Sequence, residues 1–262
     1  MKKHKKIVYI TGASSGIGRA CAKEFAKAGF DLIITGRREQ RLSELKTKLE
    51  VKYGIEIIPL IYDIRDKKGV EAAWKSLSKE TKSKITHLIN NAGGAKGLAP
   101  IQDGEIHHWD TMIDTNIKGL LYQTSLVSKH FVKNKSGHII NLCSTAGHEV
   151  YPNGAVYCAS KHAVDALTRG IRLDLYKYGI KVSQVSPAHV EETEFAVNRF
   201  DGDKKKAKIY NEFNPLTSRD VAKTIFFIAT QPKHVNIQDV LLMGTQQASS
   251  TNINKIGRIY DK

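Results

Sequence analysis

The segment KIVYITGASSGIG, residues 6–18, decides the fold of this chain. Residues 7–10 are apolar and rich in β-branched side chains, which is typical of a strand buried on both faces. A glycine-rich turn follows, and residues 19–29 have the pattern of an amphipathic helix that ends in glycine. This order suits a dinucleotide, because glycine lets the backbone approach a pyrophosphate and the helix N-terminus attracts its charge. We therefore interpret the turn as a nucleotide site rather than a plain connection.

The second predicted strand, residues 31–36, ends in two arginines, Arg37 and Arg38. About 20 residues past the glycine turn, NAD enzymes usually place a carboxylate that binds the ribose 2′-hydroxyl. A guanidinium group suits a 2′-phosphate instead, because its planar N–H donors match phosphate oxygens. We expect at least one arginine to contact that phosphate, and NADP(H) to be preferred over NAD(H). The alternative is that an arginine only solvates the start of the next helix.

Predicted strands and helices alternate along the rest of the chain. Further strands are expected at residues 55–62, 85–90, 137–143, 180–186 and 237–242, and further helices at 40–53, 67–82, 106–132, 154–178 and 218–230. This alternation predicts one α/β domain over residues 1–262, a Rossmann-like doubly wound parallel sheet of about seven strands with helices on both faces. Ligands bind such sheets beyond the carboxyl ends of the strands, where Asp63, residues 90–93, Ser144 and Pro187 are expected.

Composition agrees with this fold class. A chain of 262 residues can bury a large core, and its six prolines and dispersed glycines give no linker. The three cysteines, Cys21, Cys143 and Cys158, lack metal-ligand spacing, so we expect free thiols in a reducing cytoplasm and no metal. The N-terminus is basic, but the apolar run at residues 7–10 is too short for a signal peptide, and no stretch approaches a membrane span. The sequence therefore predicts a cytoplasmic protein.

The net charge of +15 raises the alternative of nucleic-acid binding. The lysines are scattered over many predicted helices, with short clusters such as residues 204–206, and no basic stripe is interleaved with aromatic residues. A dispersed excess of this kind is usually a solvated surface, and it also attracts an anionic cofactor. We expect a small-molecule substrate as the partner, and neither nucleic acid nor a membrane.

Tyr157 and Lys161 are four residues apart in a predicted helix, so their side chains share one face. An ammonium group beside a phenol favours the phenolate and would lower the tyrosine pKa from about 10. A tyrosine tuned in this way can pass a proton to or from an oxygen, and the Ser144 hydroxyl could hold that oxygen. By itself the spacing also occurs by chance, with a solvated lysine and a half-buried tyrosine.

In combination, these motifs resemble the short-chain dehydrogenase/reductase family. The resemblance covers most of the chain and rests on Thr11-Gly12-x-x-x-Gly16-x-Gly18, Asn90-Asn91-Ala92-Gly93 and Tyr157 with Lys161. It implies a catalytic set in which Asn116 supports a proton relay through water to the lysine: Asn116, Ser144, Tyr157 and Lys161. It also implies NADP(H) contacts from Gly12, Ser14, Ser15, Gly16, Ile17, Gly18, Arg37, Arg38, Asp63, Ile64, Asn90, Asn91, Ala92, Gly93, Tyr157, Lys161, Pro187, Val190 and Thr193.

Within the family, the chain is similar to the NADP-dependent 3-hydroxy acid dehydrogenases, some of which act on serine or allo-threonine. The similarity lies in residues 35–42, 109–116, 144–147, 193–195 and 232–237. It implies an oxidoreductase that transfers a hydride between NADP(H) and a small hydroxy or carbonyl substrate, a 3-hydroxy acid or serine-like compound. The alternatives are a reductase of another small carbonyl (an aldehyde, diketone or 3-oxoacyl thioester) and a non-enzymatic NADP-binding protein. The resemblance also implies a homotetramer, with a dimer as the alternative.

Two departures from the family pattern lie after the sixth predicted strand. Ala188 follows Pro187 where glycine is common, and Glu191 and Glu192 stand where the related branch carries small residues. Carboxylates that face the pocket would repel an acidic substrate, whereas carboxylates that face water would not. The connection at residues 187–215 is long for a compact domain, and we expect it to be a substrate loop that covers the nicotinamide end.

Overall fold

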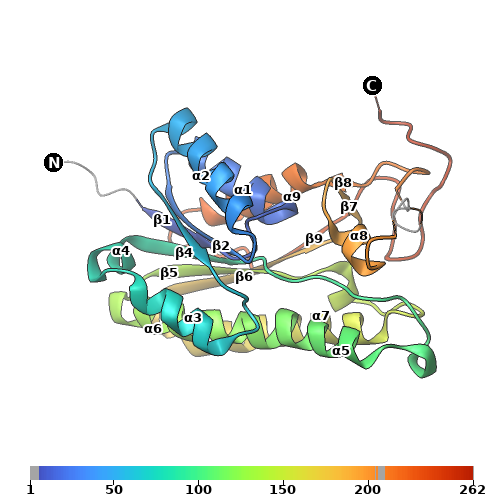
Figure 1. Ribbon diagram of the computed structural model, residues 1–262, viewed down its shortest axis with the longest axis horizontal. Helices are drawn as coiled ribbons and strands as arrows, with labels where there is room; N and C mark the ends of the chain where they lie inside the picture. The colour runs from blue at the N-terminus through green and yellow to red at the C-terminus, as the bar shows by residue number, and fades with distance from the viewer. Residues whose placement is uncertain (1–5, 204, 206–209, 262) are drawn as a thin grey trace.

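Seven parallel strands form the central sheet in the order β3-β2-β1-β4-β5-β6-β9. The computed structural model in Figure 1 describes residues 6–203, 205 and 210–261. The strands are β1 (Ile7–Ile10), β2 (Asp31–Gly36), β3 (Ile57–Ile61), β4 (Ile85–Asn90), β5 (Gly137–Leu142), β6 (Ile180–Pro187) and β9 (Asp239–Leu242). The predicted Rossmann-like fold is therefore confirmed, with the order reversing between β1 and β4.

Helices cover both faces of the sheet (Figure 1). One layer holds α1 (Gly16–Lys27), α2 (Glu39–Tyr53) and α9 (Ser218–Ala229). The other holds α3 (Lys67–Ser76), α4 (Lys79–Lys84), α5 (Ile106–Ile113), α6 (Leu120–Asn134) and α7 (Ala155–Leu175). Successive β1 side chains point to opposite faces, so Val8 and Ile10 pack on the α1 side, and Ile7 and Tyr9 pack on the other. This two-sided burial explains the unbroken apolar run of β1.

Two predicted helices are broken by local features. The helix expected at residues 67–82 ends at Ser76, and Ser78 then caps a separate helix by accepting a hydrogen bond from the Thr81 amide. The helix expected at residues 106–132 contains a π-helical turn, Asp114–Gly119, between α5 and α6. Such turns often occur at functional sites, and this one carries Asn116.

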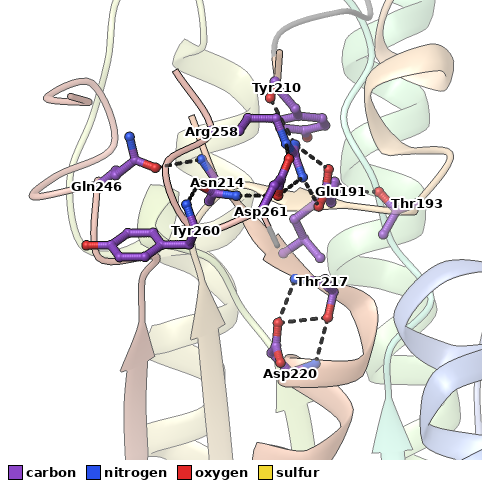
Figure 2. A network of polar contacts seen from close by, with 11 residues as sticks. Glu191, Thr193, Tyr210, Asn214, Thr217, Asp220, Gln246, Arg258, Tyr260 and Asp261 are labelled. Carbon is purple, nitrogen blue, oxygen red and sulfur yellow. Dashed lines mark hydrogen bonds and ion pairs between the residues drawn. The ribbon is translucent and has the colours of Figure 1, made fainter. Parts of the chain in front are cut away.

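The connection at residues 187–215 has more structure than its sequence suggested. It contains β7 (Val190–Glu191), which pairs with β8 (Leu216–Thr217), and the short helix α8 (Phe195–Arg199). The C-terminal segment lies against this connection (Figures 1 and 2). In Figure 2, Arg258 binds both Glu191 and Asp261, and Asn214 donates to Asp261. The connection is therefore tied to the chain terminus by charged hydrogen bonds.

Several sequence features have a simple structural description. Cys21, Cys143 and Cys158 are free and buried. Within residues 6–203, 205 and 210–261, no helix has both the length and the apolar character that crossing a membrane requires. The basic N-terminal residues up to position 5, together with Lys204 and Lys206, lie outside the described residues.

Candidate active site

A cleft of about 650 Å³ lies at the carboxyl ends of the strands, beside the reversal point between β1 and β4. It is lined by the turn after β1, by residues that follow β2 to β6, and by part of the C-terminal segment. Most of the predicted site residues share this one cleft: Gly12, Ser14, Ser15, Gly16, Ile17, Arg37, Arg38, Asp63, Ile64, Asn91, Ala92, Gly93, Ser144, Tyr157, Lys161, Pro187, Val190 and Thr193.

Three predicted site residues lie behind the cleft wall instead. The Asn90 side chain donates 2.9 Å hydrogen bonds to Thr124 Oγ1 and Asn141 Oδ1, so it links the sheet to α6. A Cβ atom on Gly18 would lie 2.4 Å from the Gly12 carbonyl oxygen, so this glycine allows close packing. Asn116 is also buried outside the lining. Asn90 and Gly18 therefore do not line the cleft, and their predicted contact with the cofactor stays a prediction.

The glycine turn fits the backbone of a dinucleotide. Gly12 and Gly16 have φ angles of +69° and +52°, which side chains disfavour, and a Cβ atom on Gly12 would lie 2.9 Å from Ala92 Cα. Asn91 holds the turn by donating to the carbonyl oxygens of Thr11 and Gly12, at 2.9 and 3.1 Å. Helix α1 begins directly after the turn with no acidic residue in its first turn. Its free N–H groups can therefore bind an anion.

Arg38 lies beside the glycine turn. Its Nη2 atom donates to Ser14 Oγ at 2.9 Å and to Ser15 Oγ at 2.8 Å, and its Nη1 atom donates to Glu194 at 2.6 Å. Partial burial by itself would raise the pKa of the Glu194 carboxyl, but hydrogen bonds from Arg41 and Arg38 outweigh it and lower that pKa to about 2. Glu194 is thus a carboxylate at neutral pH, bound to the guanidinium group that we expected to bind phosphate.

Arg37 and Asp63 lie on the cleft rim. The Arg37 side chain is 68% exposed and its Nη1 atom lies 3.5 Å from the Asp63 carboxylate. Asp63 also accepts hydrogen bonds from Arg65. Burial would raise the pKa of the Asp63 carboxyl, yet the contacts with Arg65 and Arg37 outweigh it and leave the pKa lowered. Of the two arginines after β2, Arg38 is therefore the one whose side chain is more firmly held.

Ser144, Tyr157 and Lys161 converge deeper in the cleft. Tyr157 and Lys161 lie on α7 and are buried, and the Lys161 ammonium is 5.9 Å from the centre of the Tyr157 ring. Lys161 donates to the Leu142 carbonyl oxygen at 2.9 Å, which fixes it against the end of β5. Ser144 follows β5 and accepts a hydrogen bond from the Ala146 amide. Loop, strand end and helix therefore hold the three groups together.

The pKa of Tyr157 differs from the sequence-based expectation. Burial and the neighbouring Tyr151 raise this pKa, and the hydrogen bond with Ser144 and the charge of Arg199 lower it only in part. Burial also lowers the pKa of the Lys161 ammonium. The expected lowering of the tyrosine pKa is therefore wrong for this arrangement, because desolvation disfavours both charged forms.

Asn116 positions its surroundings through its amide group. Its Oδ1 atom accepts from the Gly94 amide, and its Nδ2 atom donates to the Gly94 carbonyl oxygen and to Ser160 Oγ, all at 2.9–3.0 Å. A Cβ atom on Gly93 would lie 2.9 Å from Asn116 Oδ1 and 3.7 Å from Lys161 Nζ. Asn116 thus supports the wall beside Lys161 without a direct hydrogen bond to it.

Glu191 and Glu192 do not line the main cleft. Arg258 binds Glu191 through two hydrogen bonds of 2.8 and 2.9 Å, which Figure 2 shows. Glu192 lies on the outer side of α1, in a hollow shared with Lys23. Glu191 and Glu192, which would repel an acidic substrate if they faced the pocket, therefore lie outside the main cleft.

Other cleft residues were missed by sequence reasoning. They come from the loop after β5, from the described part of the connection after β6 and from the C-terminal segment: Tyr151, Arg199, Tyr210, Ser250, Thr251, Ile253 and Lys255. None lies in a periodic pattern or a recognisable motif. Their placement depends on how distant loops pack together, and no signal in the sequence could have found them.

Comparison with known proteins decides the family. A family model described as short chain dehydrogenase matches residues 6–204. The chain belongs to the short-chain dehydrogenase family. This agrees with the predicted resemblance and with the arrangement of Ser144, Tyr157 and Lys161 beside a glycine turn.

Individual members of the short-chain dehydrogenase family are similar over nearly their whole length. Sulfoacetaldehyde reductase 2 of Chromohalobacter salexigens is 43% identical over 246 residues, which cover 93% of this chain and 96% of that protein. The NADP-dependent 3-hydroxy acid dehydrogenase YdfG of Escherichia coli (strain K12) is 39% identical, with 95% and 99% covered. The closed form of serine dehydrogenase complexed with NADP+ has a TM-score of 0.89 and 39% identity, and the match covers 93% of this chain and 97% of that one.

Proposed function

We propose that this protein is an NADP(H)-dependent oxidoreductase that transfers a hydride between the nicotinamide and a small hydroxy or carbonyl substrate, a 3-hydroxy acid or serine-like compound. The observation that carries the proposal is one cleft that holds both the glycine turn with Arg38 and the cluster of Ser144, Tyr157 and Lys161. The similarity to NADP-dependent 3-hydroxy acid dehydrogenases and to serine dehydrogenase with NADP+ supports it.

The residues present fit the cofactor. The glycine turn and the N-terminus of α1 would hold the pyrophosphate, because the backbone there is open to close approach and has no acidic neighbour in the first helical turn. Arg38 with Ser14 would hold the 2′-phosphate. Tyr157 and Lys161 would hold the nicotinamide ribose. When bound, NADPH supplies the hydride that reduces a carbonyl carbon, and NADP+ accepts it in the reverse direction.

The protein's own groups manage the proton. Tyr157 donates its phenolic proton to the carbonyl oxygen as that oxygen gains negative charge, and Ser144 holds the same oxygen by a hydrogen bond. Because burial raises the pKa of Tyr157, the phenol keeps its proton until the acceptor becomes basic. In oxidation Tyr157 accepts the proton instead. Lys161 orients the tyrosine and stabilises its anion, and Asn116 holds the wall that positions both.

We extend the proposal to domain organisation, oligomeric state and location in the cell. Residues 1–262 form one catalytic domain, and the protein is a cytoplasmic homotetramer. Exposed apolar side chains support assembly: Leu173 and Tyr176 at the end of α7 are 73% and 68% exposed, and Ile113 and Leu121 flank the π-helical turn. The connection at residues 187–215 acts as a substrate loop over the nicotinamide end, and its tie through Arg258 to the C-terminal segment limits how far it opens.

A steady-state survey tests the function directly. NADPH oxidation is followed with small aldehydes, diketones, 3-oxo acids and 3-oxoacyl thioesters, and NADP+ reduction with 3-hydroxypropionate and L-serine. Turnover of the hydroxy acids that is lost in Tyr157→Phe supports the proposal. Turnover confined to neutral carbonyls would indicate a general carbonyl reductase. NADPH binding without turnover of any compound would indicate a binding protein instead.

A further inference from the structure

Arg199, the last residue of α8, has a guanidinium group buried in the cleft wall. The residue is 8% exposed. Its Nε atom donates to the Gly97 carbonyl oxygen, and its Nη1 atom donates to the Tyr151 phenol oxygen, both at 3.2 Å. The guanidinium carbon lies 5.8 Å from the centre of the Tyr157 ring. Among the described residues, Nη2 has no hydrogen-bond partner. Arg199 therefore keeps an unused donor near Tyr157.

Arg199 also lacks a counter-ion within the part of the chain that the structure describes. The acidic side chains around the substrate loop pair with other cations: Glu191 with Arg258, Glu194 with Arg38 and Arg41, Asp201 with Lys96 and His108, and Glu212 with Lys255. A buried charge without a partner is costly, because the interior solvates it poorly. An anion from outside the chain would balance the charge of Arg199.

The other groups at this end of the cleft are compatible with an anion. Lys255 also lines the cleft, and its ammonium group is paired with the Glu212 carboxylate. Burial raises the pKa of the Tyr210 phenol to about 12, so this residue stays a neutral hydroxyl. Every carboxylate that lines the cleft, Asp63 and Glu194, is already paired with arginine. Among the described residues that line the cleft, no unpaired carboxylate is left to repel an acid.

We propose that Arg199 binds the acid group, carboxylate or sulfonate, of the substrate whose oxygen is held by Tyr157. This inference rests on the proposed function and names the residue that selects the substrate. Since the guanidinium carbon is 5.8 Å from the centre of the Tyr157 ring, few bonds can separate the acid group from the reacting carbon. A 3-hydroxy acid meets this condition, because one methylene group separates its reacting carbon from the carboxylate. A 2-hydroxyethanesulfonate has the same spacing.

The first test compares matched substrates on the wild-type protein. Oxidation by NADP+ is measured with 3-hydroxypropionate, with 2-hydroxyethanesulfonate and with the neutral, nearly isosteric 3-hydroxypropionamide. At least one acid should exceed the amide in kcat/KM by about 10- to 100-fold, the range for one charge-assisted hydrogen bond. The preferred acid distinguishes carboxylate from sulfonate. An amide that is used as well as both acids overturns the proposal without any variant.

The second test uses Arg199→Met, which keeps an apolar stem against the two tyrosine rings. Its kcat/KM for the acid should fall by about 10- to 100-fold and its kcat/KM for the amide much less. Arg199→Lys keeps the positive charge but not the two parallel N–H donors of the guanidinium group, and should retain part of the preference for the acid over the amide. Lys223→Met is the control for general charge: Lys223 is exposed on α9 and does not line the cleft, so this variant should change the acid-to-amide ratio by no more than about fivefold. Equal losses for acid and amide in Arg199→Met mean that Arg199 only supports Tyr157, and overturn the proposal.

A binding measurement separates this inference from the proposed function. Each hydroxy acid is titrated into the protein with NADPH, and the change in nicotinamide fluorescence reports a complex that cannot turn over. Binding of the acid that is weakened in Arg199→Met supports the assignment even where no compound turns over, in which case only the proposed function fails. Acid binding that is equally strong in wild type and Arg199→Met overturns it.

Discussion

We predict that Arg38 distinguishes NADPH from NADH by binding the 2′-phosphate. The Glu194 carboxylate competes with that phosphate for the Arg38 guanidinium group. Its guanidinium group already donates to Ser14, Ser15 and the Glu194 carboxylate. A 2′-phosphate that binds here gains a charge-assisted hydrogen bond but displaces part of the pairing with Glu194. Arg38→Ala removes both effects, whereas Glu194→Gln removes only the competitor and keeps its shape. The two variants should therefore change NADPH affinity in opposite directions.

The magnitude follows from the exposure of the pair. A charge-assisted hydrogen bond contributes about 1.5–3 kcal/mol. The Arg38 and Glu194 side chains are 40% and 33% exposed, so their ion pair is near the surface range of about 0.2–1 kcal/mol. The net loss in Arg38→Ala is then about 0.5–2.8 kcal/mol, which weakens NADPH binding by about 2- to 110-fold. Glu194→Gln should strengthen NADPH binding by up to about fivefold.

The assay is a titration of nicotinamide fluorescence with NADPH and with NADH for each protein. The wild type should prefer NADPH, and neither variant should change NADH affinity appreciably, since NADH lacks the 2′-phosphate. Arg37→Ala is the matched control: Arg37 is 68% exposed and pairs only loosely with Asp63, so the loss should stay below about fivefold. An Arg38→Ala protein that loses NADPH and NADH affinity equally, or a wild type with no preference, would refute the reasoning.

The remaining predictions concern catalysis, stability and assembly. Tyr157→Phe should lower kcat by at least about 10²- to 10⁴-fold while NADPH binding survives, and a near-normal kcat would exclude Tyr157 as the proton donor. Lys161→Met should raise the pKa seen in the pH profile of kcat/KM, because an ammonium that stabilises the phenolate is lost; an unshifted profile counts against that role. Burial lowers the pKa of His87 to about 4 and that of His138 to about 2, whereas both are near 6.5 in the unfolded chain. Below pH 6.5 the unfolded state then binds more protons than the folded state. The free energy of unfolding should therefore decrease as the pH is lowered from about 6.5 to 4, by at most about 2.7 kcal/mol per pH unit for two histidines. Urea unfolding at pH 7 and 5 measures this, and equal stabilities would contradict it. Light scattering at micromolar concentration should give a tetramer, and a monomer would refute the assembly.

Much of the fold could be read from local patterns. The strands at residues 31–36 and 85–90 coincide with β2 and β4, because an apolar β-branched run bounded by turn residues depends only on the chain nearby. Helix ends were harder to predict. Ser78 divides one predicted helix, and the π-helical turn interrupts another where Gly119 packs closely on Ile64. Such breaks depend on neighbours that the local sequence does not reveal.

The site could be predicted where its chemistry is local. Ser144, Tyr157 and Lys161 share the cleft because a strand end and one helix face hold them, and both features are encoded by short spacing. Asn90 lies in an equally recognisable motif, yet its amide is turned toward Thr124 and Asn141. A motif gives the position of a side chain along the chain and not the direction in which it points.

The sequence by itself determined the family, the order of the strands and helices, and the pairing of a glycine turn with an arginine and a tyrosine–lysine helix. Only the tertiary structure decided which charges meet. Glu191 is neutralised by Arg258, which lies 67 residues further along the chain, and Arg199 is left without an acid among the described residues. The physical reason is that periodicity records the backbone conformation of each segment, whereas ion pairing and burial depend on segments brought together by packing.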